Sequence, residues 1–406
     1  MNRNTNKVIE TVGLDRIPTI ANKLLKDEAL GGKLILLAAV LALVVANSPL
    51  STYYQEFWNH VLSIGVGDYA ISMSLSHWVS EGLMAIFFLV VGLEIKREIV
   101  RGRLRDPRAA VLPIGAAIGG MIVPAVLFFM INQGQPETLR GWAIPIATDI
   151  AFAVAVMSLL GNRVSSALKL FLLTLAIVDD IGAVLIIALF YNSGLSPAFL
   201  IASLLLCGLI LVLNRLKLMS VALFVLLSVV LWVFVYESGV HASITGALLG
   251  LLAPLAAYKG SSIAERLESA SIPVSTFIVV PLFAFASLGI VVAIDTLSLG
   301  STLAWGIVIG LVFGKVIGVT LTSWVLVRPK LAVLPDKSNW FQLAGVGLLA
   351  GIGFTISVFI AELAFSDNAS LMNTAKISIL IASTVSAVAG YLFLRHRQKV
   401  EEILNK

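Results

Sequence analysis

Long apolar runs separated by short polar connections dominate the pattern of hydrophobic and polar positions along this chain. Twelve of these runs approach or exceed the ~20 residues that a helix needs to cross a bilayer. They lie near residues 33–47, 77–95, 109–131, 142–160, 170–191, 198–213, 219–236, 240–257, 273–293, 301–326, 340–365 and 376–394. The pattern predicts an all-α polytopic membrane protein with about twelve transmembrane helices.

Composition supports this class and removes others. Of 406 residues, 59% are hydrophobic, and the mean hydropathy is +0.99. A net charge of +5 raises the question of nucleic acid, but the basic residues sit in short loops between apolar runs, so we expect no nucleic-acid partner. The single cysteine, Cys207, lies inside an apolar run and excludes a disulfide framework within one chain.

The placement of basic residues orients the predicted helices. If the N-terminus is cytoplasmic and the spans alternate, all but three of the 28 Lys and Arg residues fall on the cytoplasmic side. Arg140 and Lys376 lie outside, and Lys315 lies within a span. Segment 48–76 has no Lys or Arg, whereas the next loop is strongly basic. This positive-inside bias predicts that both termini are cytoplasmic.

Three parts follow from this map: a cytoplasmic N-terminal segment 1–30, a single transmembrane domain 31–395 and a cytoplasmic tail 396–406. Segment 1–30 lacks the features of a signal peptide, and residues 8–30 are compatible with an amphipathic surface helix interrupted by Pro18. Segment 48–68 is too polar for a span. Its aromatic residues fit either an external, partner-contacting element or a plain interfacial belt.

Four charged residues, Asp149, Asp179, Asp180 and Lys315, cannot be moved to a water interface. Ionisable residues at membrane depth are expensive and indicate a functional site. Five acids lie nearer the span ends, where a solvated or funnel-lining position is the simpler interpretation: Glu81, Glu94, Glu98, Glu237 and Glu362.

Two spans carry features that interrupt a helix. Pro145 precedes Thr148 and Asp149 in the fourth span and removes a backbone donor. The eleventh span has four glycines between residues 345 and 353, which either weaken the helix or allow close packing. Spans 3–5 and 10–12 start on opposite sides, so they form inverted triplets with irregular middle helices. Such pairs point to a transporter site near the midplane.

The adjacent acids Asp179 and Asp180 point about 100° apart on a helix. One can therefore pair with Lys315 while the other faces a cavity, and the two should titrate as a coupled set. Carboxylate, hydroxyl and carbonyl oxygens suit hard cations. The expected ligands are Na⁺ or Li⁺ in competition with H⁺, without a bound cofactor.

At these residues the sequence resembles the NhaA family of sodium–proton antiporters. The similarity is carried by AIPIATDIAFAVAV, LAIVDDIGAVLIIALFY, EGLMAIFFLVVGLEIKRE, SGVHASITG, PLFAFASLG and GIGFTIS, and it extends from about residue 31 to residue 395. The inverted-repeat fold is a known property of that family. One departure concerns the loop RLESASIP, where Ser269 and Ile272 cannot titrate, so a pH response different from that of members with histidines there is expected.

The resemblance implies twelve helices with helices 4 and 11 unwound and crossing, electrogenic exchange of Na⁺ or Li⁺ for H⁺, and a homodimer in a bacterial inner membrane. It places an external β-hairpin near 48–68. It implies that Asp180 is the main cation ligand and a proton carrier, and that Asp179 binds ions and pairs with Lys315. Thr148 and Asp149 would belong to the crossing. The pH-response positions implied are Glu94, Arg97, Glu98, His241 and Glu268.

Other classes fit less well. A sodium-coupled solute symporter would use similar carboxylates and broken helices but needs a larger organic-substrate pocket. An intramembrane aspartyl protease matches only the literal Gly65–Asp68 sequence, which falls in the external segment. A passive channel does not explain the interior acid–lysine set. We therefore expect a secondary transporter and not an enzyme.

Overall fold

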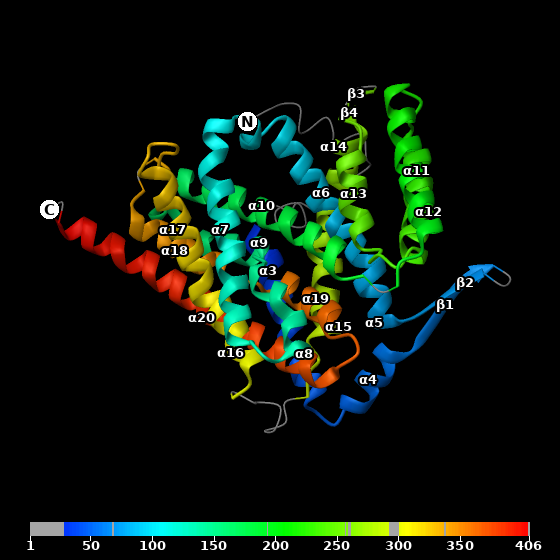
Figure 1. Ribbon diagram of the computed structural model, residues 1–406, viewed down its shortest axis with the longest axis horizontal. Helices are drawn as coiled ribbons and strands as arrows, with labels where there is room; N and C mark the ends of the chain where they lie inside the picture. The colour runs from blue at the N-terminus through cyan, green and yellow to red at the C-terminus, as the bar shows by residue number, and fades with distance from the viewer. Residues whose placement is uncertain are drawn as a thin grey trace, which may run out of the picture.

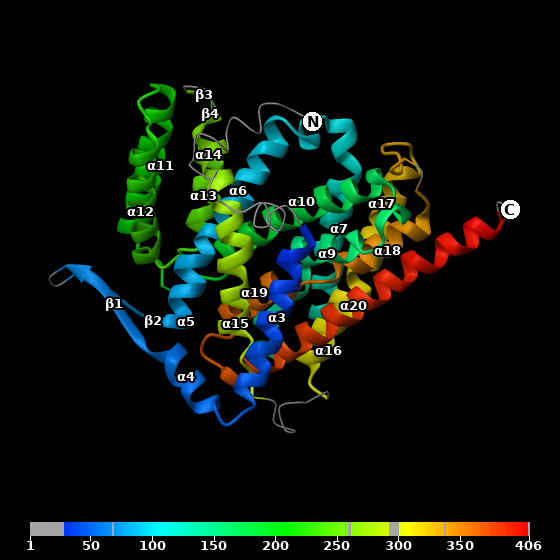
Figure 2. The same cartoon turned by 180° about the vertical axis from the view of Figure 1, so that it is seen from behind.

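The protein is a bundle of helices with two short β-ribbons (Figure 1). The structure is a computed structural model and describes residues 28–66, 69–192, 194–255, 257–258, 261–291, 300–336 and 338–404. The residues predicted to form an amphipathic N-terminal helix lie almost entirely outside these ranges. Helices α11 and α12 stand side by side at one edge of the bundle, and α20 slants toward the opposite edge in both views (Figures 1 and 2).

The elements follow the chain in this order. The first half contains α3 (Glu28–Ala46), α4 (Ser51–Asn59), β1 (Val61–Val66), β2 (Tyr69–Ser74), α5 (Leu75–His77), the π-helical η2 (Trp78–Leu83), α6 (Met84–Val100), η3 (Arg103–Arg105), α7 (Pro107–Ile131), α8 (Pro136–Leu139), the 3₁₀ helix η4 (Arg140–Ile146), α9 (Ile150–Ser158), η5 (Gly161–Arg163) and α10 (Ser166–Phe190). The second half contains α11 (Pro197–Arg215), α12 (Val221–Glu237), α13 (Ile244–Leu252), β3 (Ala257–Tyr258), β4 (Ser261–Ser262), α14 (Ile263–Val274), the π-helical η6 (Ser275–Val279), α15 (Val280–Ser287), α16 (Thr302–Ile309), the π-helical η8 (Gly310–Gly314), α17 (Lys315–Val327), α18 (Trp340–Ala350), α19 (Phe354–Ala364) and α20 (Ala369–Leu404).

The described helices support a polytopic membrane protein. By length and composition, seven helices in the described ranges are able to cross a membrane, and up to ten if each bent pair counts as one span. Each of the twelve predicted runs overlaps a helix or a series of helices in the described ranges. The difference in number comes from short elements: α12 has 17 residues, and α13 has only nine.

Two of the helix pairs bend at the positions that the sequence marks as irregular. The pair η4 and α9 bends by 45°, and the pair α18 and α19 bends by 46°. Pro145 lies in the 3₁₀ turn before the first break, and Gly351 and Gly353 flank the second. Both breaks leave a short non-helical stretch inside the bundle, so their backbone groups need partners other than their own helix.

The segment expected to hold a hairpin is divided differently from the prediction. Its first part forms helix α4, which buries Tyr54 and Trp58. The strands come later: β1 pairs antiparallel with β2, from Val61 opposite Ser74 to Val66 opposite Tyr69. The two-stranded ribbon therefore extends past residue 68, and it projects away from the helices (Figure 2).

Glycines allow two helix pairs to approach closely. A β-carbon on Gly246 of α13 would lie 1.8 Å from the carbonyl oxygen of Ala85 in α6. A β-carbon on Gly318 of α17 would lie 2.2 Å from the carbonyl oxygen of Gly119 in α7. In lipid, the hydrophobic effect does not drive helices together, so their association depends on close packing, which small residues at the interface allow. The contact between α7 and α17 also positions Lys315, the first residue of α17.

Candidate functional site

The two helix breaks meet in the interior and satisfy each other's backbone. The amide of Asp149 donates to the carbonyl oxygen of Ile352 over 2.6 Å. The Thr148 hydroxyl lies 2.8 Å from the carbonyl oxygen of Ala350. Beyond the breaks, the Ser357 hydroxyl donates to the carbonyl oxygen of Ile144 over 2.7 Å. Groups freed by the unwound turns thus find partners across the crossing, which is a requirement at membrane depth.

Asp149 stabilises the beginnings of two helices at once. Its Oδ1 accepts the amide of Phe152 at the start of α9, at 3.1 Å. Its Oδ2 accepts the amide of Thr355 at 3.0 Å and the Thr355 hydroxyl at 2.6 Å, at the start of α19. Helix N-termini carry partial positive charge and unpaired amides, which a carboxylate compensates. Asp149 therefore lies where the two broken helix pairs meet and bonds the first turns of both α9 and α19.

Lys315 and Asp179 form an ion pair sealed from solvent. The lysine Nζ lies 2.5 Å from Asp179 Oδ2, and both side chains are 0% exposed. The Thr148 hydroxyl donates to the same oxygen over 2.6 Å. Breaking such a pair from one side leaves a buried charge without compensation. The structure thus brings together three of the residues that the sequence singled out, and it ties the α10 acid to the crossing.

Asp180 is the buried acid that the lysine does not contact in the described structure. It is 3% exposed, and its Oδ1 has no hydrogen-bond partner among the described residues. The Oδ1 of Asp179 is likewise without a partner there. Buried polar atoms are normally paired, so orphaned oxygens call for an explanation such as an ion or a proton.

These oxygens are suited to a hard cation. Among the described residues no group of three His, Cys, Asp or Glu side chains gathers to hold a metal ion. A cation at the two aspartates would therefore complete its shell with neutral oxygens, for example the Thr148 hydroxyl. Weak, mixed oxygen coordination suits an ion that is bound and released.

The π-helical segment η8 directly precedes Lys315, which is the first residue of α17. Gly310–Gly314 forms this wider turn, and a β-carbon on Gly314 would lie 2.8 Å from the Cα of Pro124 in α7. Lysine at this position is fully buried. π-Helical turns frequently occur at functional sites because they re-aim a side chain. The sequence predicts the buried lysine but gives no sign of the wider turn.

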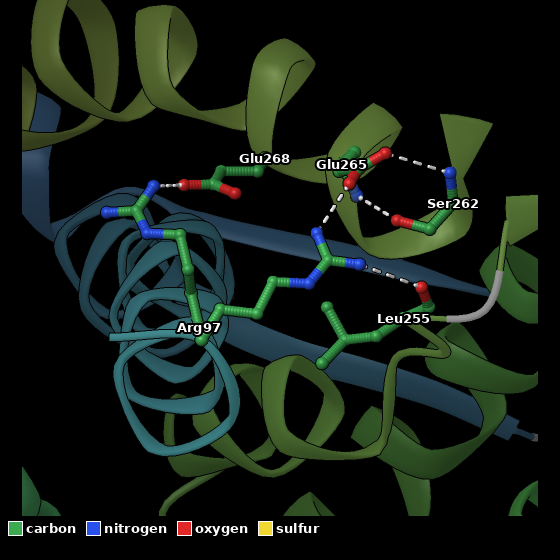
Figure 3. Close-up of polar contacts among 6 residues, drawn as sticks. Arg97, Leu255, Ser262, Glu265 and Glu268 are labelled. Atoms are coloured by element: carbon green, nitrogen blue, oxygen red, sulfur yellow. Dashed lines mark hydrogen bonds and ion pairs between the residues drawn. The ribbon is translucent and has the colours of Figure 1, made fainter. Parts of the chain in front are cut away.

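Four of the predicted pH-response positions lie on the neighbouring helices α6 and α14: Glu94, Arg97, Glu98 and Glu268. Arg97 forms an ion pair with Glu268, and Arg101 pairs with Glu265 at 2.9 Å (Figure 3). Glu98 accepts the amide of Arg103 over 3.0 Å, and Glu94 lies one turn earlier on α6. The pair of Arg101 with Glu265 is exposed on both sides, and such pairs contribute little to stability, whereas the side chain of Glu268 is only 16% exposed.

His241 contacts an acid whose burial the sequence did not indicate. Its Nδ1 lies 2.7 Å from Oε1 of Glu81, and the amide of Ser243 donates to Oε2 over 3.1 Å. Glu81 is 2% exposed, so it is not a solvated end residue, although it lines two cavities, as the funnel-lining interpretation expects. The only sequence signal was an acid within the apolar run 77–95. Thr355 and Ser357 were also missed, although their hydroxyls follow the glycine-rich break.

The comparison with known proteins identifies the family. A family model described as Na⁺/H⁺ antiporter 1 matches residues 22–394. The chain belongs to this family. The Na⁺/H⁺ antiporter NhaA of Shewanella loihica is 46% identical over 374 residues, covering 91% of this chain and 95% of that protein. NhaA of Escherichia coli is 46% identical over 379 residues, covering 93% of this chain and 98% of that protein.

In this member of the Na⁺/H⁺ antiporter 1 family, the crossing should lose stability when Thr355 can no longer donate to Asp149. We expect Thr355→Val to lower the free energy of unfolding by about 1–3 kcal/mol, because the buried carboxylate loses a hydroxyl donor. The measurement is the melting temperature in detergent. Thr384→Val is the control, since Thr384 is exposed and bonds only its own helix. Equal melting temperatures for both variants would contradict the role of Thr355.

Proposed function

We propose that this protein exchanges cytoplasmic Na⁺ or Li⁺ for external H⁺ by alternating access. The observation that carries the proposal is the arrangement of Asp179, Asp180 and Lys315 beside the crossing: one acid is paired with the lysine, and the other has a buried oxygen without a partner. The names of the relatives agree with this reaction. The exchange needs the chain's own side chains and no resident cofactor.

In this mechanism Asp180 is the main cation ligand and proton carrier. Its unpartnered oxygen supports this role. Asp179 shares ion and proton binding and returns to Lys315 when the cation leaves. Thr148 and Asp149 hold the crossing around the site, as their contacts to Ala350 and Thr355 indicate. Moving the crossing relative to α10 would expose the site to alternate sides.

The finer architecture of the proposal is twelve spans built around two inverted repeats. Support comes from the two bent pairs, which have nearly equal angles of 45° and 46°. Each pair follows one long helical unit and precedes another: α7 and α10 flank the first, and the α16–α17 series and α20 flank the second. We place both termini in the cytoplasm, following the distribution of Lys and Arg, and we place the protein in a bacterial inner membrane, as the family resemblance implies.

We further propose a homodimer in the lipid bilayer and a cytoplasmic pH-response region. The ribbon β1–β2 supports the dimer because it projects from the bundle with Val61, Leu62 and Ile64 exposed. An exposed strand edge is a template for pairing with another chain. For the pH response we assign Glu94, Arg97, Glu98 and Glu268 on the cytoplasmic side, and His241 on the external side.

The decisive experiment is Na⁺-induced proton movement in proteoliposomes that contain only this protein, measured at several pH values. The proposal expects proton flux on addition of Na⁺ or Li⁺ without any organic solute. Proton movement that requires an organic solute would instead indicate a symporter. No proton movement at any pH would refute the exchange.

Competition between the ions gives a quantitative prediction. Na⁺ and H⁺ share the carboxylates, so they compete once the pH is low enough for the site to be protonated. In that range, each decrease of one pH unit should lower the apparent Na⁺ affinity about tenfold for each proton displaced. If two protons exchange for one Na⁺, an inside-negative potential supplies about 2.3 kcal/mol per 100 mV. Na⁺ flux is measured at a clamped potential without a pH gradient. Flux indifferent to voltage, with pH-independent affinity, would exclude this mechanism.

A further inference from the structure

Glu81 is a buried acid outside the central site. It sits in the π-helical segment η2, where its carboxylate is held by His241 and by the amide of Ser243. The indole of Trp232 donates to its backbone carbonyl over 3.0 Å, which fixes this turn against α12. Shortly after His241 in the chain, the hydroxyls of Ser243 and Thr245 are buried without hydrogen-bond partners in the described structure. An ionisable residue held this firmly at a span calls for a function.

Two cavities share Glu81 as part of their walls. Their volumes are about 530 Å³ and 380 Å³. The lining residues common to both are His77, Glu81, His241, Leu363 and Ser366. The larger cavity also reaches Arg140 at the start of η4 and Tyr191 directly after α10. By the predicted orientation all of these element ends lie on the external side.

This location is separate from the central aspartates. Helix α10 runs without a break from Asp180 to Phe190, and Phe190 lines the larger cavity. A rise of 1.5 Å per residue puts these two positions about 15 Å apart along the helix axis. The central aspartates and the larger cavity are therefore two separate positions along α10, and in the predicted orientation the cavity lies at the external end of this helix.

The formal charges of each cavity leave Glu81 unbalanced when the histidines are neutral. In the larger cavity the other charged residues are Arg140 and Asp367, which have opposite sign. In the smaller cavity they are Glu362 and Lys376, which form an ion pair at 2.8 Å. The remaining titratable groups facing the cavities are His77, His241, Tyr54, Tyr191 and Tyr236. Each cavity thus has one carboxylate that no opposite charge balances, and in both cavities this carboxylate is Glu81.

We propose that Glu81 forms an outer cation site, at which Na⁺ or a proton is held between the central aspartates and the external solution. A low-dielectric cavity wall with a single uncompensated carboxylate concentrates cations. This inference rests on the proposed exchange and adds a second binding residue to its external path.

The test measures the Na⁺ concentration for half-maximal exchange on each membrane face. Right-side-out vesicles report the external face and everted vesicles the cytoplasmic face, from a host without its own Na⁺/H⁺ antiporters. Glu81→Gln keeps the size of the side chain and one oxygen that accepts the amide of Ser243, and its amide nitrogen is able to donate to the ring of His241. It should raise the external constant by roughly tenfold, from loss of one charge near the ion, and leave the cytoplasmic constant unchanged.

Glu237→Gln is the matched control. Glu237 is an exposed acid at the same end of the bundle, and neither cavity includes it. Its variant should match the wild type on both faces. If Glu81→Gln does not reach the membrane, Glu81→Asp is the second variant. It keeps the charge but shortens the side chain by one methylene, so it should raise the Na⁺ concentration for half-maximal exchange on the external face alone.

Two results would overturn the outer site: an unchanged external constant in the Glu81 variant, or equal changes on both faces, which would indicate a structural role. Failure of the exchange itself is separate, because it appears in the wild type. Wild-type vesicles of both orientations without Na⁺-driven proton movement would refute the proposed function, whatever the variants do.

Discussion

Replacing Asp180 by asparagine is expected to abolish Na⁺-driven proton movement while leaving a folded, inserted protein. The amide keeps the size of the side chain and loses both its charge and its ability to titrate. The ion pair between Asp179 and Lys315 and the hydrogen bond between Asp149 and Thr355 do not involve this residue. The measurement is Na⁺-induced pH change in proteoliposomes, which should fall to the level of vesicles without protein.

The control for this variant is Asp336→Asn. Asp336 is exposed in the connection between α17 and α18, so its loss of charge should leave exchange intact. Asp179→Asn should also impair exchange, because it removes the partner of Lys315 as well as a titrating group. Exchange near the wild-type rate in the Asp180 variant would overturn its assignment as cation ligand and proton carrier.

Lys315→Ala is expected to produce the largest loss of stability. The lysine is fully buried, and its removal leaves the Asp179 carboxylate without a cation in a closed interior. Breaking a buried pair in this way costs about 3–5 kcal/mol when the remaining group stays charged. The melting temperature of the purified protein, measured from pH 5 to pH 9, should be lower than that of the wild type.

A double-mutant cycle separates loss of the pair from loss of packing. Lys315→Met fills the space of the lysine without its charge, and adding Asp179→Asn removes the uncompensated acid. The double variant should recover much of the stability lost by Lys315→Met alone, because neutral replacements of a buried pair are often tolerated. Lys33→Ala on the exposed side of α3 is the control. An unchanged melting temperature for Lys315→Ala would contradict the buried pairing.

The sequence was sufficient to predict which charged residues lie in the interior of the bundle. The four charged residues predicted to lie away from water, Asp149, Asp179, Asp180 and Lys315, are all buried. The cost of charge at membrane depth makes such residues rare, so each one is informative. Pro145 likewise predicts a break because its ring removes a backbone donor from the helix. These are local properties of the chain, and they need no knowledge of the tertiary contacts.

What the sequence did not reveal depends on contacts between distant segments. Glu81 resembles an end residue until His241, 160 positions later in the chain, is seen to hold it. The aromatic residues of segment 48–68 fitted either an external, partner-contacting element or an interfacial belt, whereas in the structure Tyr54 lies on helix α4 and packs against Phe285. The π-helical turns η2 and η8 likewise depend on neighbouring helices, which no sequence pattern in one segment reports.

The ion pair between Asp179 and Lys315 has a consequence for synthesis of the protein. The two residues are 136 positions apart, whereas Thr148 is only 31 positions from Asp179. At about 5–20 residues per second, roughly 7–27 seconds separate the synthesis of the acid from that of its cation. During this interval α10 has to enter the membrane with its acids neutral or still in contact with water. The proposed transport site is therefore completed late, when α17 arrives, and a chain arrested before residue 315 would hold two carboxyls that have no counter-ion.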